Sequence, residues 1–227
     1  MHKYTLYILT FLTGLLFISC EPETTVPDQN KIFTSYTVIY NHSLDKTTAT
    51  VDFTLDNPSN LSIDKIKLTH PASIKYNAKE LLFNENKRNY NKEFIGTVNS
   101  QFDYIDYNGT RFINEAVIPE PIVINGLPDT IGITEDLFII WEGSELQANE
   151  QILVTFENID QNTNFKFNAQ ASTNNIIPID QGALYNLGTG NCIVTLARHI
   201  IKSVNEKPVA GGSIFTKYEV QDTIYFY

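Results

Sequence analysis

The sequence predicts an all-β protein built from two consecutive β-sandwich domains. Apolar and polar residues alternate along short segments, as in 49–55, where polar residues separate Ala49, Val51 and Phe53. This period of two buries one face of a strand and exposes the other. Clusters of Gly, Pro, Asn and Asp separate such segments, and helical periodicity is nearly absent. Together these three observations favour β-sandwiches over helical or mixed folds.

Further segments with strand character follow one another at short intervals, with turn residues between them. Their ranges are 32–40, 61–68, 94–105, 111–118, 137–141, 151–156, 164–171, 192–201, 213–220 and 223–227. The segments 77–83 and 180–187 are each long enough to form one helical turn.

The sequence predicts which residues pair across the strands of two hairpins. Asn108-Gly109 is a strong signal for a two-residue turn because both residues tolerate positive φ, and Asn77-Ala78 is a weaker signal of the same kind. Each turn sets opposite charges across from each other, which helps to fix the register. The expected pairs are Asp106 with Arg111 in the first hairpin and Lys75 with Glu80 in the second.

The domain boundary is expected where chain breakers are densest. These clusters are Pro119-Glu120-Pro121 and the segment 125–129, and proline disfavours a central strand. The division gives one domain at 31–126 and a second at 127–227. Each has about 100 residues, a size typical of immunoglobulin-like sandwiches. One large β-sandwich is the alternative.

The N-terminus has the pattern of a secretory signal peptide. Residues 4–19 are uncharged and mostly apolar, and they follow Lys3. The run is slightly short for a membrane-spanning helix, which needs roughly 20 apolar residues. Glu21 and Glu23 follow it instead of a basic stop-transfer cluster, so residues 1–19 are expected to be a cleaved signal.

The end of this run, Phe17-Ile18-Ser19-Cys20, resembles the lipobox of bacterial lipoproteins. The resemblance implies cleavage before Cys20, a diacylglycerol on its sulfur and an acyl chain on its new amino group. Two or more such chains suffice for stable membrane anchoring. Residues 20–30 are rich in Pro and acids, so we expect a flexible tether there.

Further along the chain, TATVDFTLDNP, DYNGTRFINEAVIPEPIVI, FIIWEGSEL and GGSIFTKYEV resemble segments of Bacteroidota-type lipoproteins with tandem immunoglobulin-like domains. This resemblance implies an outer-membrane location, at the cell surface or, alternatively, at the periplasmic face. Its motifs are structural, so it implies no catalytic residues.

Charge excludes some classes of partner. The chain has 16 basic and 26 acidic residues, for a net charge of −10, and losing Lys3 with the signal makes it more negative. Nucleic-acid binding rests on neutralising phosphates with basic residues, so nucleic acid is not an expected partner. Adsorption to anionic headgroups is disfavoured for the same reason.

No catalytic or metal-binding motif is found. His42, His70 and His199 are scattered, without the paired spacing of a metal site. If Cys20 carries lipid, Cys192 has no partner, and its strand-like surroundings predict a small buried hydrophobe. We therefore expect a non-enzymatic protein with no cofactor and no metal, apart from the lipid on Cys20.

The aromatic residues divide into core and surface candidates. Phe53, Phe102, Phe138, Phe156 and Trp141 lie in strand patterns and are expected in the core. Exposed tyrosines bind sugar faces and peptides. The candidates for such contacts are Tyr104, Tyr107 and Tyr185.

The function predicted from the sequence is that of a membrane-anchored, non-catalytic binding module for glycan or protein at the cell envelope. The alternative is a structural or accessory subunit of an envelope or adhesive assembly.

Overall fold

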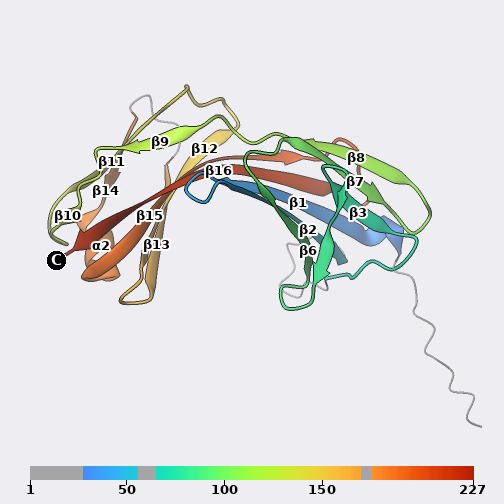
Figure 1. The fold of residues 1–227 in the computed structure, drawn as a ribbon, viewed down its shortest axis with the longest axis horizontal. Coiled ribbons are helices and arrows are strands. Elements are labelled where there is room, and N and C mark those ends of the chain that lie inside the picture. Colours follow the sequence, from blue (N-terminus) through green and yellow to red (C-terminus); the bar gives the residue numbers. More distant parts are fainter. Residues whose placement is uncertain (1–27, 56–64, 170–174) are drawn as a thin grey trace, which may run out of the picture.

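The computed structural model describes residues 28–55, 65–169 and 175–227, and nearly all of their regular structure is β (Figure 1). The all-β sandwich class is therefore confirmed. The signal peptide, Cys20 and the tether up to residue 27 lie outside the described residues, as does the segment 56–64.

The elements follow one another in chain order. They are η1 (Gln29–Lys31), β1 (Ile32–Asn41), β2 (Lys46–Leu55), β3 (Ser73–Tyr76), β4 (Lys79–Glu80), β5 (Leu82–Asn84), β6 (Asn89–Ile95), β7 (Ser100–Ile105), β8 (Arg111–Ala116), β9 (Ile122–Asn125), β10 (Thr130–Ile131), β11 (Leu137–Gly143), β12 (Glu150–Asn158), β13 (Thr163–Ala169), β14 (Ile176–Ile179), α2 (Gln181–Leu187), β15 (Gly190–Ser203) and β16 (Gly212–Phe226).

Three sheets build the molecule. The central sheet has nine strands in the order β13-β12-β15-β16-β1-β2-β6-β5, with β10 also paired to β16. The N-terminal cover sheet has the order β4-β3-β7-β8, and the C-terminal cover sheet has the order β14-β11-β9. In Figure 1 the two cover sheets lie over opposite ends of the arched central sheet. Each end is thus a two-layered lobe, which we call the N-lobe and the C-lobe.

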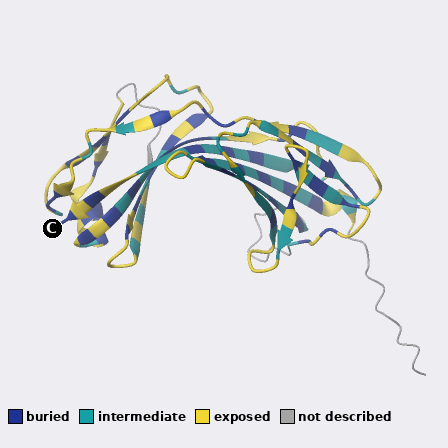
Figure 2. Cartoon of the chain, viewed as in Figure 1, coloured by how far each residue is buried: buried dark blue, intermediate teal, exposed yellow. Residues whose placement is uncertain are grey.

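Aromatic and aliphatic side chains between the layers form the core. In the N-lobe the Tyr36 and Phe102 rings lie 4.6 Å apart, and those of Phe53 and Tyr104 lie 4.7 Å apart. In the C-lobe, Trp141 of the cover sheet is buried in the same hydrophobic cluster as Phe156 of the central sheet. Figure 2 shows the resulting alternation of buried and less buried residues along the central strands.

The central sheet is continuous across the expected domain boundary. β1 pairs in parallel with β16, from Thr34 opposite Gly212 to Asn41 opposite Glu219. The far end of β16 lies in the C-lobe, where Phe226 pairs with Ile131 of β10. The two segments 31–126 and 127–227 therefore share one sheet, and the division at residue 126 stays a prediction about folding units.

The hairpin at Asn77-Ala78 has the expected register. Lys75 pairs with Glu80, and the backbone φ angles of Asn77 and Ala78 are 49° and 56°. Two positive φ angles give the turn the twist that neighbouring strands need.

The register expected at Asn108-Gly109 is wrong by one residue. Arg111 pairs with Ile105, and Asp106 lies in the loop instead of facing Arg111. The Asp106 carboxylate accepts hydrogen bonds of 2.8 Å from the backbone N–H groups of Asn108 and Thr110. An Asp side chain that bonds its own turn in this way removes the residue from the ladder. The Arg111 guanidinium bonds Asp103 instead, at 2.8 Å.

Other expected strands are divided, joined or absent. The run 94–105 is divided between β6 and β7, because the chain leaves the central sheet after Ile95 and enters the N-terminal cover sheet at Ser100; Gly96 between them has a φ of 74°. The runs 213–220 and 223–227 join in β16, and the described part of 61–68 contributes only a bridge from Lys65 to Thr54. The segment 77–83 is a hairpin without helix, whereas 180–187 does contain α2, capped by Asp180.

Candidate binding surfaces

The three tyrosines proposed from the sequence do not form one site. Tyr104 is fully buried, so its expected exposure is wrong. Its burial between the sheets raises the pKa of its hydroxyl above the ordinary value. Tyr107 is half-buried, and its hydroxyl accepts a 3.1 Å hydrogen bond from the Thr69 backbone N–H. Tyr185 is 69% exposed, but it lies on α2 in the other lobe.

Four of the five aromatic residues expected in the core are buried: Phe53, Phe102, Phe156 and Trp141. The expectation for Phe138 is wrong, because its side chain is 51% exposed. β11 turns Leu137, Ile139 and Trp141 toward the central sheet, so the residues between them face away from the core. An unbroken apolar run is typical of strands buried on both faces, but β11 is covered on only one.

The exposed side of the C-terminal cover sheet is apolar. Phe138 lies opposite Pro178, and Ile140 lies opposite Ile176 on the neighbouring strand. The exposed fractions of Ile140, Ile176 and Val123 are 39%, 46% and 43%. We call this surface the apolar face; its residues are Val123, Phe138, Ile140, Ile176 and Pro178.

Acidic residues border the apolar face at both ends. Glu142, which follows Ile140 on the same side of β11, accepts a 2.6 Å hydrogen bond from Asn125. At the other end Asp136 accepts a 2.9 Å hydrogen bond from Gln181, and Asp180 caps the N-terminus of α2. The sequence contains no lysine or arginine between Arg111 and Arg198 except Lys166 of β13, which belongs to the central sheet.

The free edge of β14 is poorly suited to pairing with another strand. The Trp141 backbone N–H donates a 3.0 Å hydrogen bond to the Asn175 carbonyl. By the alternation of an antiparallel ladder, Ile176 and Pro178 then present their backbone groups to the outer edge. Proline has no N–H to donate, so the edge is blunted. The accessible feature of this sheet is therefore its apolar face rather than its strand edge.

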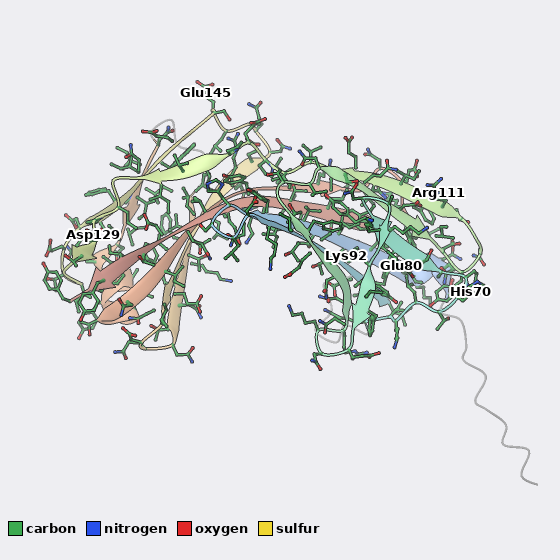
Figure 3. The ribbon with its side chains drawn as sticks, viewed as in Figure 1. His70, Glu80, Lys92, Arg111, Asp129 and Glu145 are labelled. Carbon is green, nitrogen blue, oxygen red and sulfur yellow. The ribbon has the colours of Figure 1, made fainter. Side chains whose placement is uncertain are left out.

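The matching side of the N-terminal cover sheet is polar. Its strands β7 and β8 present Gln101, Asp103, Arg111 and Glu115, with the Arg111–Asp103 ion pair among them, and the half-buried Ile105 and Ile113 are the apolar residues of these two strands on that side. Arg111 is labelled on this side of the lobe in Figure 3. Two sheets in equivalent positions thus expose different surfaces, one mainly polar and the other mainly apolar.

A buried ion pair fixes the loop next to the apolar face. Arg198 of β15 is 1% exposed and pairs with Glu150 at the start of β12. Its guanidinium also donates to Ser144 Oγ at 2.8 Å and to the Glu145 carbonyl at 3.0 Å. These contacts give Arg198 a structural role, because all of its partners lie in the loop between β11 and β12 or at Glu150, where that loop ends. Glu145 marks that loop in Figure 3.

Cys192 and His199 are both buried. Burial raises the pKa of the Cys192 thiol to about 11, which keeps it protonated and poorly nucleophilic. His199 packs against the Phe215 ring at 5.4 Å, and burial, with the charge of Lys217, lowers its pKa. Among the described residues no three His, Cys, Asp or Glu side chains come together as a metal site would require.

Within the described ranges, no helix has the length and apolar character needed to cross a membrane.

No family model and no curated protein matches the chain. Among solved structures, one from work on the host cell surface retention of a 1.5-MDa bacterial ice-binding adhesin matches with 11% sequence identity and a TM-score of 0.25. The match covers 86% of this chain and 65% of that one. At this identity and TM-score it carries no argument about function.

Proposed function

We propose that this protein is a non-catalytic, lipid-anchored binding module that docks a protein partner on its apolar face. The observation that carries the proposal is the contrast between the two cover sheets. Both bury one side against the same central sheet, yet only the C-terminal sheet exposes Phe138, Ile140 and Ile176 on the other side. Contiguous exposed apolar side chains on a soluble domain mark interaction surfaces.

The chemistry of the apolar face favours a protein over a glycan. Its side chains are aliphatic or phenyl groups, which have no hydrogen-bond donors or acceptors for sugar hydroxyls. Interfaces between proteins place such groups at their centre and polar groups at their rim. Here Asp136, Asp180 and Glu142 supply the rim.

The acidic residues beside the apolar face indicate the charge that the partner should carry. The acids at both ends of the face favour a partner whose apolar surface is flanked by Lys or Arg. Complementary rim charges mainly speed association, and salt weakens that effect. We therefore expect binding to be faster at low ionic strength.

The proposed location is the outer membrane. The lipobox-like stretch ending at Cys20 supports anchoring there, and residues 20–30 are the proposed tether. Protease treatment of intact cells tests the orientation, with Cys20→Ala as the unanchored control. Cleavage on whole cells supports the cell surface, whereas protection until the outer membrane is broken supports the periplasmic face.

The alternative is a permanent structural or accessory subunit. Obligate interfaces are larger and more apolar than transient ones. A partner that stays bound through purification at high salt favours this alternative, whereas a partner that dissociates on dilution favours the binding module.

The experiment that tests docking is site-specific photo-crosslinking in cells. A photoreactive phenylalanine analogue replaces Phe138 in one strain and Lys75, on the polar cover sheet, in the control strain. We expect a defined adduct only at position 138, and its loss when Ile140→Glu is added. The adduct partner should carry Lys or Arg beside an apolar patch at the crosslinked point.

Two results would contradict the proposal. One is equal crosslinking at positions 138 and 75, which indicates nonspecific contact. The other is an adduct at position 138 that Ile140→Glu leaves unchanged, since a charge in the middle of a docked apolar face is strongly unfavourable.

A further inference from the structure

A second surface lies on the N-lobe, independent of the apolar face. It is a cleft of about 610 Å³ where three segments of the chain meet. The β3–β4 turn contributes Asn77, strands β7 and β8 contribute Gln101 and Glu115, and the loop between β15 and β16 contributes Asn205 and Glu206. The cleft is wide open to solvent, so it suits a ligand that lies across the surface more than a small molecule enclosed in a pocket.

The wall formed by the β15–β16 loop is held rigidly. Asn114, which is 1% exposed, accepts hydrogen bonds from the backbone N–H groups of Asn205 and Glu206, at 3.0 and 3.1 Å. Its amide N–H₂ donates to the Glu206 carbonyl at 2.6 Å. The Glu206 carboxylate in turn accepts from the Ile113 N–H. A buried asparagine therefore fixes a loop from the end of the chain against β8.

The opposite wall is also fixed. The turn at Asn77 and Ala78 belongs to the hairpin whose two central residues have positive φ. β3 pairs with β7, so this turn is held beside the start of β7, where Gln101 lies. A cleft with two fixed walls loses little conformational freedom when a ligand binds.

The lining mixes polar, acidic and apolar groups, and Ala78 and Ile113 supply apolar surface. Side-chain amides come from Asn77, Gln101 and Asn205, and carboxylates come from Glu115 and Glu206. The amides offer both donors and acceptors, whereas the carboxylates accept only. Among the described residues no lysine or arginine lines the cleft, and Arg111, whose charge acts on Glu206 from outside the lining, is already ion-paired with Asp103.

We propose that this cleft binds a short segment of an uncharged, hydroxyl-rich glycan. Each sugar hydroxyl both donates and accepts, which matches a lining of amides and carboxylates. A phosphate or a uronic acid would meet Glu115 and Glu206 without a compensating cation. Only two carboxylates line the cleft, and among the described residues no three His, Cys, Asp or Glu side chains come together to hold a divalent cation.

The test is a binding titration of the purified full chain against two sets of oligosaccharides. One set is neutral: gluco-, manno- and xylo-oligosaccharides. The other is anionic: oligogalacturonates of matched length. We expect a neutral oligosaccharide to bind at millimolar concentrations or below, and its anionic counterparts to bind at least about tenfold more weakly, a difference of about 1.4 kcal/mol.

Matched variants locate the binding. Gln101→Ala should weaken the neutral ligand by about tenfold or more, because it removes an amide from the cleft. Gln151→Ala, an exposed amide of β12 in the central sheet, should leave binding unchanged. Phe138→Ser should also leave it unchanged, since the apolar face is a separate surface. Circular dichroism verifies that each variant is folded.

Three outcomes would overturn the proposal. The first is a folded chain that binds none of the neutral oligosaccharides. The second is neutral binding that Gln101→Ala does not weaken, which places the ligand elsewhere. The third is preferential binding of the anionic set, or of a polyamine added as a cationic probe, which assigns the cleft to charged ligands.

Discussion

The N-lobe and the C-lobe are built on the same plan but expose different surfaces. In both, a small cover sheet packs on one end of the central sheet and buries alternate residues against it. The N-terminal cover sheet turns ion-paired and amide side chains outward, whereas the C-terminal one turns Phe138, Ile140 and Ile176 outward. Since the inner faces already supply the core, the chemistry of the outer faces can differ between the lobes without changing the fold.

The interior chemistry also differs between the lobes. Tyr36, Tyr76, Tyr90 and Tyr104 are buried in the N-lobe, while Tyr185, Tyr225 and Tyr227 of the C-lobe are largely exposed. The C-lobe instead buries the Arg198–Glu150 ion pair. The two lobes should therefore respond differently to mutation and to alkaline pH, and both depend on the strand they share.

The largest expected effect follows removal of that shared strand. Deleting residues 212–227 should abolish the cooperative unfolding transition of both lobes, because β16 pairs with β1, β10 and β15. The shorter deletion of 223–227 should lower the melting temperature by removing Ile224 and Phe226 from the core. Thermal denaturation followed by circular dichroism measures both.

The same comparison tests the division at residue 126. A 28–126 fragment lacks the parallel partner of β1, so we expect it to remain unfolded until the complementary fragment is added. A 28–126 fragment that melts cooperatively by itself would instead establish the N-terminal segment as a folding unit.

Arg198→Met should destabilise the C-lobe by about 3–5 kcal/mol, because Glu150 is left charged and buried without its partner. The double variant Arg198→Met/Glu150→Leu should recover part of this loss, since no unpaired charge remains. Urea denaturation followed by the fluorescence of Trp141, the single tryptophan, measures the free energy of unfolding. A single variant as stable as the native chain would remove any structural role for the pair.

Alkaline pH should act mainly through the N-lobe. Burial raises the pKa of Tyr76 and that of Tyr90 from 10 to about 12. Between pH 10 and pH 12 these two hydroxyls are ionised in the unfolded chain but still protonated in the folded chain. Their contribution to folding stability is therefore complete below pH 10 and falls as the pH rises toward 12. Tyrosinate absorbance and circular dichroism, recorded together, should show buried tyrosines ionising only as structure is lost. Ionisation of every tyrosine near pH 10 in a folded chain would contradict this.

Two tyrosine hydroxyls of the N-lobe should differ in their contribution to stability. Tyr76→Phe removes a 2.6 Å hydrogen bond to the Val98 carbonyl and should cost about 1 kcal/mol. Tyr104→Phe removes a buried hydroxyl with no hydrogen-bond partner among the described residues, so it should be neutral or slightly stabilising. Chemical denaturation of the two variants, side by side, decides whether Tyr104 is purely a core residue.

Substitutions at the apolar face should cost little stability compared with core substitutions. Phe138→Ser and Ile140→Thr should each lower the free energy of unfolding by about 1 kcal/mol, because the two side chains are already 51% and 39% exposed in the free protein. The same variants should weaken partner crosslinking. A large loss of stability would mean that the apolar face belongs to the core instead of serving as a docking surface.

The strand content, the burial of Cys192 and the register at Asn77-Ala78 were accessible from the sequence. Each depends on neighbours in the chain: a period of two, an apolar run, or a pair of turn residues that adopt positive φ. The hairpin at Asn108-Gly109 was placed correctly, but its register was not, because the Asp106 side chain accepts hydrogen bonds from the Asn108 and Thr110 N–H groups within a longer loop.

The candidate surfaces were decided by tertiary structure. Leu137 to Trp141 is apolar at every position, so nothing in the run says which residues face the core and which face solvent; packing on one side only leaves Phe138 exposed. Tyr104 appeared as a surface candidate but lies between two layers. The cleft brings together Asn77 and Glu206, which are far apart in the sequence. Asn41 of β1 likewise lies beside Glu219 of β16, although 178 positions separate these two residues. Local periodicity fixes which strands form, whereas pairing over such separations depends on the closure of the whole sheet.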